Sequence, residues 1–253
     1  MARAFGQAVG APGRLPRRVH AAARHGRPLD PRYRKGGVHV ILTPSPSPAS
    51  GRGVTLDPFY PIVDSAAWVA RLVGVGARLV QLRVKDRDEA AVARETREAL
   101  ARCRGAGATL VVNDYWRIAI AEGADWVHLG QEDLDTADLG AIRKAGLKIG
   151  VSTYSEAELA RGLAIEPDYV ALGPIFPTIS KALSVAAQGL ERLTDWKRRV
   201  GALPLCAIGG IDLERAKLCL AAGADIVSVI SDITLDIDPE ARARAWIAAT
   251  RRA

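Results

Sequence analysis

The sequence has 253 residues, a formal net charge of +7 and 49% hydrophobic residues. Acids and arginines interrupt every apolar run before it reaches about 18 residues, so no membrane-spanning helix is expected. The three cysteines, Cys103, Cys206 and Cys219, follow no zinc or disulfide pattern and fit a reducing compartment, so we expect a cytoplasmic protein.

The positive charge is concentrated in residues 1–56. This segment holds ten Lys and Arg and one acid, for a net charge of +9, which leaves −2 for residues 57–253. It has no helical or strand period, and Pro44–Pro48 has linker composition, so we interpret it as a tail that is disordered or not translated. A transit peptide has a similar composition. The tail lacks aromatic interleaving, and its apolar stretch Val38–Leu42 is too short for the core of a signal peptide, so we expect neither nucleic acid nor a membrane as a partner.

Residues 57–253 form one domain in which strand-like and helix-like patterns alternate eight times, which predicts a parallel sheet. Eight units favour a closed (β/α)₈ TIM barrel. An open doubly wound sheet is the alternative, but Asp64-Ser65 is not the Gly-rich turn that it would need after its first strand. The expected strands are Phe59–Val63, Leu79–Arg83, Leu110–Asn113, Trp126–Leu129, Lys148–Val151, Tyr169–Gly173, Leu205–Ile208 and Ile226–Ile230. The expected helices are Ser65–Gly74, Asp88–Arg104, Tyr115–Glu122, Thr136–Ala145, Ser155–Leu163, Leu190–Val200, Leu213–Ala222 and Pro239–Ala249.

Acidic residues follow two neighbouring strands. Asp114 comes directly after the third strand, and Asp133 comes shortly after the fourth. Because neighbouring strands lie about 4.8 Å apart, the two carboxylates can converge on one Mg²⁺, which takes one or two carboxylates and completes its shell with water and phosphate. The alternative is structural, with Asp114 capping a helix and Asp133 in a turn.

Cations and hydroxyls follow other strands at the same end of the barrel. Strand alternation places Gln81, Arg83 and Lys85 on one face, where an anion would offset the cost of burying charge. Salt bridges to Asp86 and Asp88 are the alternative. The loop after the sixth strand presents Thr178, Ser180 and Lys181, and Ser152 ends the fifth strand. Gly209-Gly210 and Ser231 lie where this fold usually binds phosphate.

The end of the barrel at which the strands finish, which we call the mouth, combines three cations, two acids and a separate glycine-rich turn. The capacity of these groups to bind anions exceeds what one monophosphate needs. It suggests a diphosphate with Mg²⁺ plus a second, phosphorylated substrate. Of the four histidines in the sequence, only His128 lies in residues 57–253. It stands inside a strand pattern, where a packed or hydrogen-bonded histidine is the default. No general base or activated nucleophile is evident, so we expect catalysis by electrostatic stabilisation of a leaving diphosphate.

The chain resembles thiamine phosphate synthase from about Phe59 to Ile233. The matching stretches are QLRVKD (81–86), VND (112–114), HLGQED (128–133), GVS (150–152), GPIFPTISK (173–181), AIGGI (207–211) and VIS (229–231). The resemblance implies a Mg²⁺-dependent transferase that joins hydroxymethylpyrimidine diphosphate to a thiazole phosphate and releases diphosphate. It implies metal binding by Asp114 and Asp133, and catalytic cations at Arg83, Lys85 and Lys181. The implied pyrimidine diphosphate site comprises Gln81, Arg83, Lys85, Asn113, Ser152 and Lys181, and the implied thiazole phosphate site comprises Thr178, Ser180, Gly210, Ile230 and Ser231.

Two positions depart from the family pattern. Val84 stands where glutamate is common, and Ser180 where threonine is common; Ser180 keeps a hydroxyl, and Val84 should point away from Arg83 and Lys85. The related thiazole tautomerases lack the paired acids and use a histidine where this chain has Tyr154. Other readings that stay open are another phosphate-binding barrel enzyme, or a barrel that binds thiamine precursors without catalysis. The sequence does not predict the oligomeric state.

Overall fold

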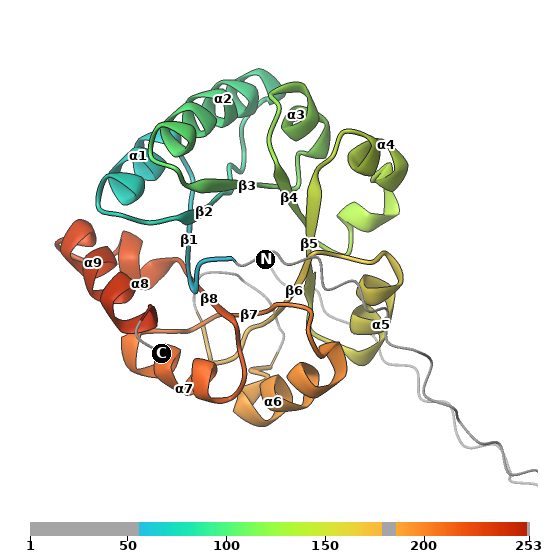
Figure 1. The fold of residues 1–253 in the computed structure, drawn as a ribbon, viewed down its shortest axis with the longest axis vertical. Helices are drawn as coiled ribbons and strands as arrows, with labels where there is room; N and C mark the ends of the chain where they lie inside the picture. The colour runs from blue at the N-terminus through green and yellow to red at the C-terminus, as the bar shows by residue number, and fades with distance from the viewer. Residues whose placement is uncertain (1–55, 179–185, 252–253) are drawn as a thin grey trace, which may run out of the picture. The chain divides into compact units, whose positions relative to one another are not determined.

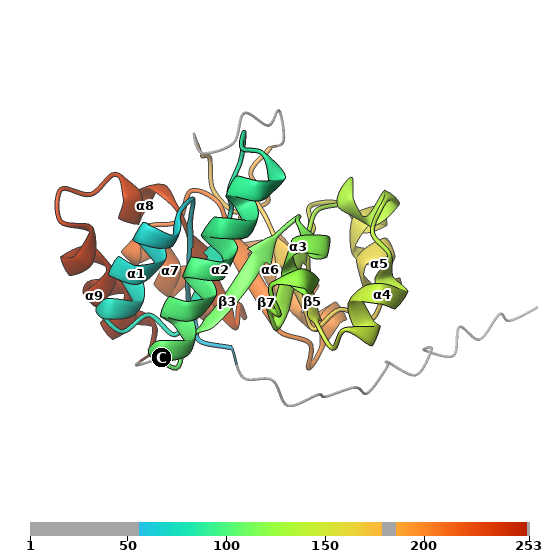
Figure 2. The ribbon, with the colours of Figure 1, turned by 90° about the horizontal axis from the view of Figure 1, so that it is seen from above.

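The computed structural model describes residues 56–178 and 186–251, and within them eight parallel strands close into a barrel. Each strand pairs with the next along the chain, and the last strand, β8 (Ile226–Val229), returns to the first, β1 (Phe59–Val63), through Phe59↔Val227 and Tyr60↔Ser228. Figure 1 shows the ring of strands with the helices outside it, and Figure 2 shows the same arrangement turned by 90°. The predicted (β/α)₈ barrel is confirmed.

The strands and helices lie close to the predicted ones. The strands are β1 Phe59–Val63, β2 Leu79–Leu82, β3 Thr109–Asn113, β4 Trp126–Leu129, β5 Lys148–Thr153, β6 Tyr169–Leu172, β7 Leu205–Ile208 and β8 Ile226–Val229. The helices are α1 Ala66–Gly74, α2 Glu89–Gly105, α3 Trp116–Ala121, α4 Leu139–Lys144, α5 Glu156–Ala164, α6 Gly189–Val200, α7 Leu213–Ala221, α8 Ser231–Thr234 and α9 Pro239–Thr250, with a 3₁₀ turn, η1, at Asp133–Asp135.

Side-chain caps set where several helices begin. Ser65 Oγ accepts a hydrogen bond from Trp68 N at 3.4 Å, and Asp88 Oδ1 accepts one from Ala91 N at 2.7 Å. Helix α4 begins at Leu139 rather than at the predicted Thr136, because η1 precedes it and Asp138 provides its cap. The short α8 and η1 were not predicted, since neither is long enough to show a helical period.

The barrel carries two separate apolar cores. The larger one fills the space between the strands and the helices. The smaller one fills the barrel interior, where Tyr60, Trp126 and Tyr169 are buried among aliphatic side chains. A Cβ on Gly150 would lie 2.1 Å from the Tyr169 ring, so only glycine leaves room for this tyrosine beside β5. The interior is therefore packed, and only the barrel ends can admit a ligand.

Acids at the amino ends of strands accept backbone N–H groups there. Asp168 Oδ2 accepts from Ile149 N, and Asp225 Oδ2 accepts from Leu205 N, each at 2.8 Å. Asp57 pairs with Arg251 at 2.9 Å, which ties the first described residues to the end of α9. Within residues 56–178 and 186–251, no helix combines the length and apolar composition needed to cross a membrane.

A chain shortened to begin at Leu56 is therefore expected to fold and turn over like the full chain. It retains Asp57 and every strand of the barrel. We expect the unfolding midpoint in urea to agree within error between the two chains, and likewise the rate of the transferase reaction that the resemblance implies. Unfolding of the shortened chain, or loss of its activity, would place the domain boundary before residue 56.

Candidate active site

Lys85, Asp114 and Asp133 converge at the carboxyl ends of β2, β3 and β4. Lys85 Nζ forms an ion pair with Asp114 Oδ2. Asp114 directly follows β3 and adopts a left-handed backbone (φ 66°), and its N–H donates to His128 O at 2.9 Å. Gly130 N donates to Asp133 Oδ2 at 2.8 Å, so the turn after β4 holds this acid. The two acids predicted from the sequence thus lie together.

The two carboxylates are close enough to repel each other. Burial raises the pKa of Asp133, and the charge of Asp114 and a side-chain hydrogen bond with it raise this pKa further. Opposing them, the Gly130 N–H and the Lys85 ammonium lower it. Such a pair is relieved by a cation between the acids, so the residues present fit a hard divalent ion. Among the described residues no group of three or more His, Cys, Asp or Glu side chains is placed to hold a metal ion. A metal held by these two acids would complete its shell with water and substrate oxygens.

A series of hydrogen bonds, which we call the relay, crosses the barrel interior from Gln81 on β2 to Ser152 on β5. Gln81 Nε2 donates to the Tyr60 hydroxyl at 2.8 Å, and the Tyr60 and Tyr169 hydroxyls lie 2.9 Å apart. Tyr169 Oη lies 2.7 Å from His128 Nδ1, and His128 Nε2 lies 2.7 Å from Ser152 Oγ. Each proton of the relay is used once if the Tyr60 hydroxyl donates to Tyr169, the Tyr169 hydroxyl donates to His128 Nδ1, and His128 Nε2–H donates to Ser152 Oγ. The Ser152 hydroxyl then keeps its own proton for an anion.

This relay joins two predicted substrate residues, Gln81 and Ser152, through side chains that sequence reasoning did not select. Tyr60, Tyr169 and His128 read as ordinary strand residues, and the expectation that His128 is hydrogen-bonded is confirmed. Burial raises the pKa of both tyrosines far above the usual range, so both stay protonated and act as fixed hydrogen-bond partners. Inward-facing polar positions on β1, β4 and β6 are the signal that could have found them.

Tyr169→Phe is expected to destabilise the fold by about 1–3 kcal/mol. The change removes the hydroxyl that both Tyr60 and His128 contact and leaves their polar atoms buried without it. The free energy of unfolding in urea measures the loss. Tyr154→Phe is the matched control, because Tyr154 is 42% exposed. Equal stability of the two variants would show that the relay adds nothing to the fold.

Two amides beside the acids carry buried atoms that lack partners within the described part of the chain. Asn113 is 5% exposed, and its Nδ2 donates to none of the described residues. Gln131 Nε2 donates to Ser152 O at 2.8 Å, while its Oε1 is likewise unpartnered. Buried polar groups are normally satisfied, so unsatisfied ones at a barrel mouth point to a ligand that supplies the missing partner.

A small cavity lies on the other side of the mouth, at the ends of β7 and β8. Gly209 and Gly210 both adopt positive φ, and a Cβ on Gly210 would lie 2.3 Å from Pro177 O. Close packing against the segment after β6 therefore requires these glycines, in addition to any approach by a phosphate. The cavity is lined by Thr178, Ile208, Gly209, Gly210, Ile211, Ser228, Val229, Ile230 and Ser231. It gathers every described member of the predicted thiazole phosphate site.

Arg83 lies between the two parts of the mouth. It lines a second cavity of about 410 Å³ together with Trp68 and Ile230. Val84 is buried in the larger apolar core, whereas Arg83 is only half-buried, which agrees with the expectation that Val84 points away from Arg83. The remaining predicted residues, Ser180 and Lys181, lie outside the described residues, so their assignments stay predictions.

The three cysteines do not take part in this site. All three are buried, and burial raises the pKa of Cys103 and of Cys219 to about 12. Their thiols therefore stay protonated near neutral pH, which agrees with the absence of an activated cysteine expected from the sequence. Fold and site together define a parallel (β/α)₈ barrel that collects acids, a cation and a glycine-rich turn at the carboxyl ends of its strands, where enzymes of this fold carry out their chemistry.

The model of the family described as "Thiamine monophosphate synthase" matches residues 59–233. The thiamine-phosphate synthase of Rhizobium etli is 61% identical over 195 residues, which cover 77% of this chain and 96% of that protein. The thiamine-phosphate synthase of Neisseria meningitidis (serogroup A) is 46% identical over 188 residues, covering 74% and 92%. The thiamine phosphate pyrophosphorylase of Pyrococcus furiosus superposes with a TM-score of 0.69 at 27% identity, covering 77% and 95%.

The chain therefore belongs to the thiamine monophosphate synthase family, a family of transferases in thiamine biosynthesis. The resemblance read from the seven short motifs is confirmed at the level of the family.

Proposed function

We propose that this chain joins hydroxymethylpyrimidine diphosphate to a thiazole phosphate, forming thiamine phosphate and releasing diphosphate with the help of Mg²⁺. The observation that carries the proposal is the division of the barrel mouth. Paired acids with Lys85 lie at the ends of β2 to β4, and the cavity at Gly210 lies at the ends of β7 and β8. Two phosphorylated substrates need two such sites.

The pyrimidine diphosphate would bind on the side of the acids. Ser152 and Lys85 can donate to its phosphate oxygens, and Asn113 Nδ2 can meet an acceptor on the pyrimidine ring. Gln81 would be held in place by the relay through Tyr60. Because these groups are fixed before substrate arrives, they need little reorganisation when charge develops.

Asp114 and Asp133 would hold Mg²⁺, which neutralises diphosphate charge when bound. In the structure Lys85 pairs with Asp114. A metal on the two carboxylates would leave the Lys85 ammonium able to donate to diphosphate instead. This chain would thus place two kinds of positive charge against one leaving group.

The thiazole phosphate would bind across the mouth, where Thr178, Gly210 and Ser231 line the small cavity. Hydroxyls and backbone N–H groups suit a phosphate there. In the reaction the bond from the pyrimidine methylene carbon to the diphosphate oxygen breaks, and a bond from that carbon to the thiazole nitrogen forms. The nitrogen carries no proton to be removed, so no general base is needed.

The deciding experiment incubates the purified chain with both substrates and Mg²⁺ and detects thiamine phosphate by mass spectrometry. Reactions that lack either substrate or the enzyme are the controls. Conversion of one thiazole phosphate isomer into another, with no coupled product, would indicate a tautomerase instead. Binding of both substrates without turnover would indicate a non-catalytic barrel.

A further inference from the structure

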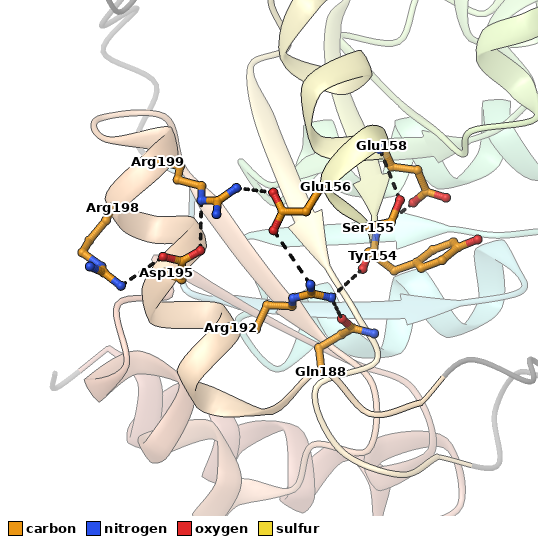
Figure 3. Close-up of polar contacts among 9 residues, drawn as sticks. All are labelled: Tyr154, Ser155, Glu156, Glu158, Gln188, Arg192, Asp195, Arg198 and Arg199. Carbon is orange, nitrogen blue, oxygen red and sulfur yellow. Dashed lines mark hydrogen bonds and ion pairs between the residues drawn. The ribbon is translucent and has the colours of Figure 1, made fainter. Parts of the chain in front are cut away.

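An ion-pair network joins helix α6 to the start of helix α5, and Figure 3 shows it in close-up. Arg199 contacts both Glu156, in the first turn of α5, and Asp195, one turn earlier on α6. Arg192 reaches the same Glu156, with Nη2 3.8 Å from Oε1. The two arginines share one carboxylate, but their other contacts differ.

Arg192 also bonds two groups that border the active site. Its Nη1 donates to Gln188 Oε1 at 2.7 Å and to the carbonyl oxygen of Tyr154 at 3.4 Å. Tyr154 directly follows β5, two residues after Ser152. Gln188 directly precedes α6, at the end of the connection from β6. Figure 3 shows the Arg192 guanidinium between these two groups.

Gln188 is in turn bonded to the beginning of the same connection. Its backbone N–H donates to Pro174 O at 2.8 Å, and the next N–H, of Gly189, donates to Ile175 O at 3.0 Å. Ile175 N donates to Ile208 O at 2.9 Å, so this segment is also fastened to β7. Thr178, three residues further on, lines the cavity at Gly210. A continuous path of contacts thus runs from Arg192 to the wall of the thiazole phosphate site.

We propose that Arg192 is a positioning residue for the reaction under "Proposed function", on which this inference rests. It touches neither cavity of the mouth. It fixes the segment at Gln188 against the carboxyl end of β5. It thereby sets the spacing between two walls of the mouth, one at Ser152 on the pyrimidine diphosphate side and one at Thr178 on the thiazole phosphate side. The two substrates bind on these walls, and a small error in their alignment costs rate rather than affinity.

Arg199 provides a matched control within the same network. Both arginine side chains are partly exposed, 38% for Arg192 and 46% for Arg199, and exposed ion pairs contribute little to overall stability. Within the described part of the chain, the ion-pair partners of Arg199 are Glu156 and Asp195, neither of which belongs to the segment after β6. A role in stability alone would make the two arginines equivalent, whereas a positioning role would not.

The first test compares Arg192→Met with Arg199→Met. We expect the Arg192 variant to lose roughly tenfold in kcat, with both KM values within about twofold of wild type, and the Arg199 variant to stay within twofold throughout. Arg192→Lys, which keeps a cation near Gln188 Oε1, should recover part of the loss. Gln188→Ala should match Arg192→Met, and the double variant should lose no more than either single one.

The second test needs no substrate. Amide hydrogen exchange at Gln188 and Gly189 should speed up in Arg192→Met and stay unchanged in Arg199→Met. Equal kcat and equal exchange in the two variants would overturn the proposal, as would additive losses in the double variant. If wild-type protein forms no thiamine phosphate, the function proposed above fails, and the exchange comparison still decides whether Arg192 fixes this segment.

Discussion

Asp114→Ala and Asp133→Ala are each expected to lower kcat on the order of 10²-fold or more, because each removes one of the two carboxylates that would hold Mg²⁺. The structure places both acids together, and the raised pKa of Asp133 reflects its burial and its proximity to Asp114. Steady-state rates of thiamine phosphate formation across a Mg²⁺ titration measure the effect. Wild-type activity should vanish with EDTA and return with added Mg²⁺.

Asp135→Ala is the control for this prediction. Asp135 lies in the same short turn as Asp133, but it is exposed and pairs with Arg161 at 2.6 Å. Its replacement should leave the rate and the Mg²⁺ dependence unchanged. Binding of Mn²⁺ in the presence of diphosphate provides a readout that does not depend on turnover. Full activity of either acid variant in EDTA would remove the metal from the proposal.

The fold could be predicted from the sequence because its pattern is local and repeated. β1, β4 and β7 have the predicted bounds, since each is a short apolar run ended by polar residues or glycine. β3 begins one residue earlier than predicted, at Thr109, and the other strand errors fall at the carboxyl ends. β5 extends to Thr153, and α8 begins directly after β8, where the sequence predicted only the end of a strand. These ends depend on contacts between neighbouring strands and loops, which no single segment specifies.

The candidate site could be predicted in part for the same reason. Lys85, Asp114 and Asp133 are close in space because parallel neighbouring strands end at one edge, and strand order follows the sequence. Tyr60, Tyr169 and His128 were not predicted as a unit, because their contacts cross the barrel between strands that are far apart in the chain. Closure of the barrel brings these three side chains together. The pattern of a single strand does not indicate which residues will face each other across the barrel interior.

At Gly210 the sequence indicated only part of the reason why this position requires glycine. The sequence suggested that this glycine allows a phosphate to approach the backbone. The structure shows that a side chain there would meet the Phe176 and Pro177 carbonyls before any ligand is bound. The packing between β7 and the segment after β6 therefore restricts this position independently of function, and contacts of this kind appear only when the chain is folded.

The remaining prediction concerns the order of bond breaking and bond formation. The described part of the mouth offers Lys85 and the Ser152 hydroxyl on the side proposed for the diphosphate, and within it no nucleophile or general base is evident. A diphosphate on a benzylic-type carbon of an electron-rich aminopyrimidine can leave before the thiazole nitrogen bonds, which gives a resonance-stabilised cation. The protein would then neutralise the departing charge and align the two rings.

An electron-withdrawing substituent on the pyrimidine is therefore expected to slow a single turnover by orders of magnitude, because it destabilises that cation. Substituents of similar size that do not withdraw electrons are the matched controls and should react at nearly the parent rate. Lys181→Ala should lower kcat strongly, since the charge it removes matters most as diphosphate leaves. Single-turnover rates are compared after binding of the analogues is shown to be similar. A flat or inverted dependence on electron withdrawal would indicate direct displacement by the thiazole nitrogen, because that path develops no positive charge on the pyrimidine ring.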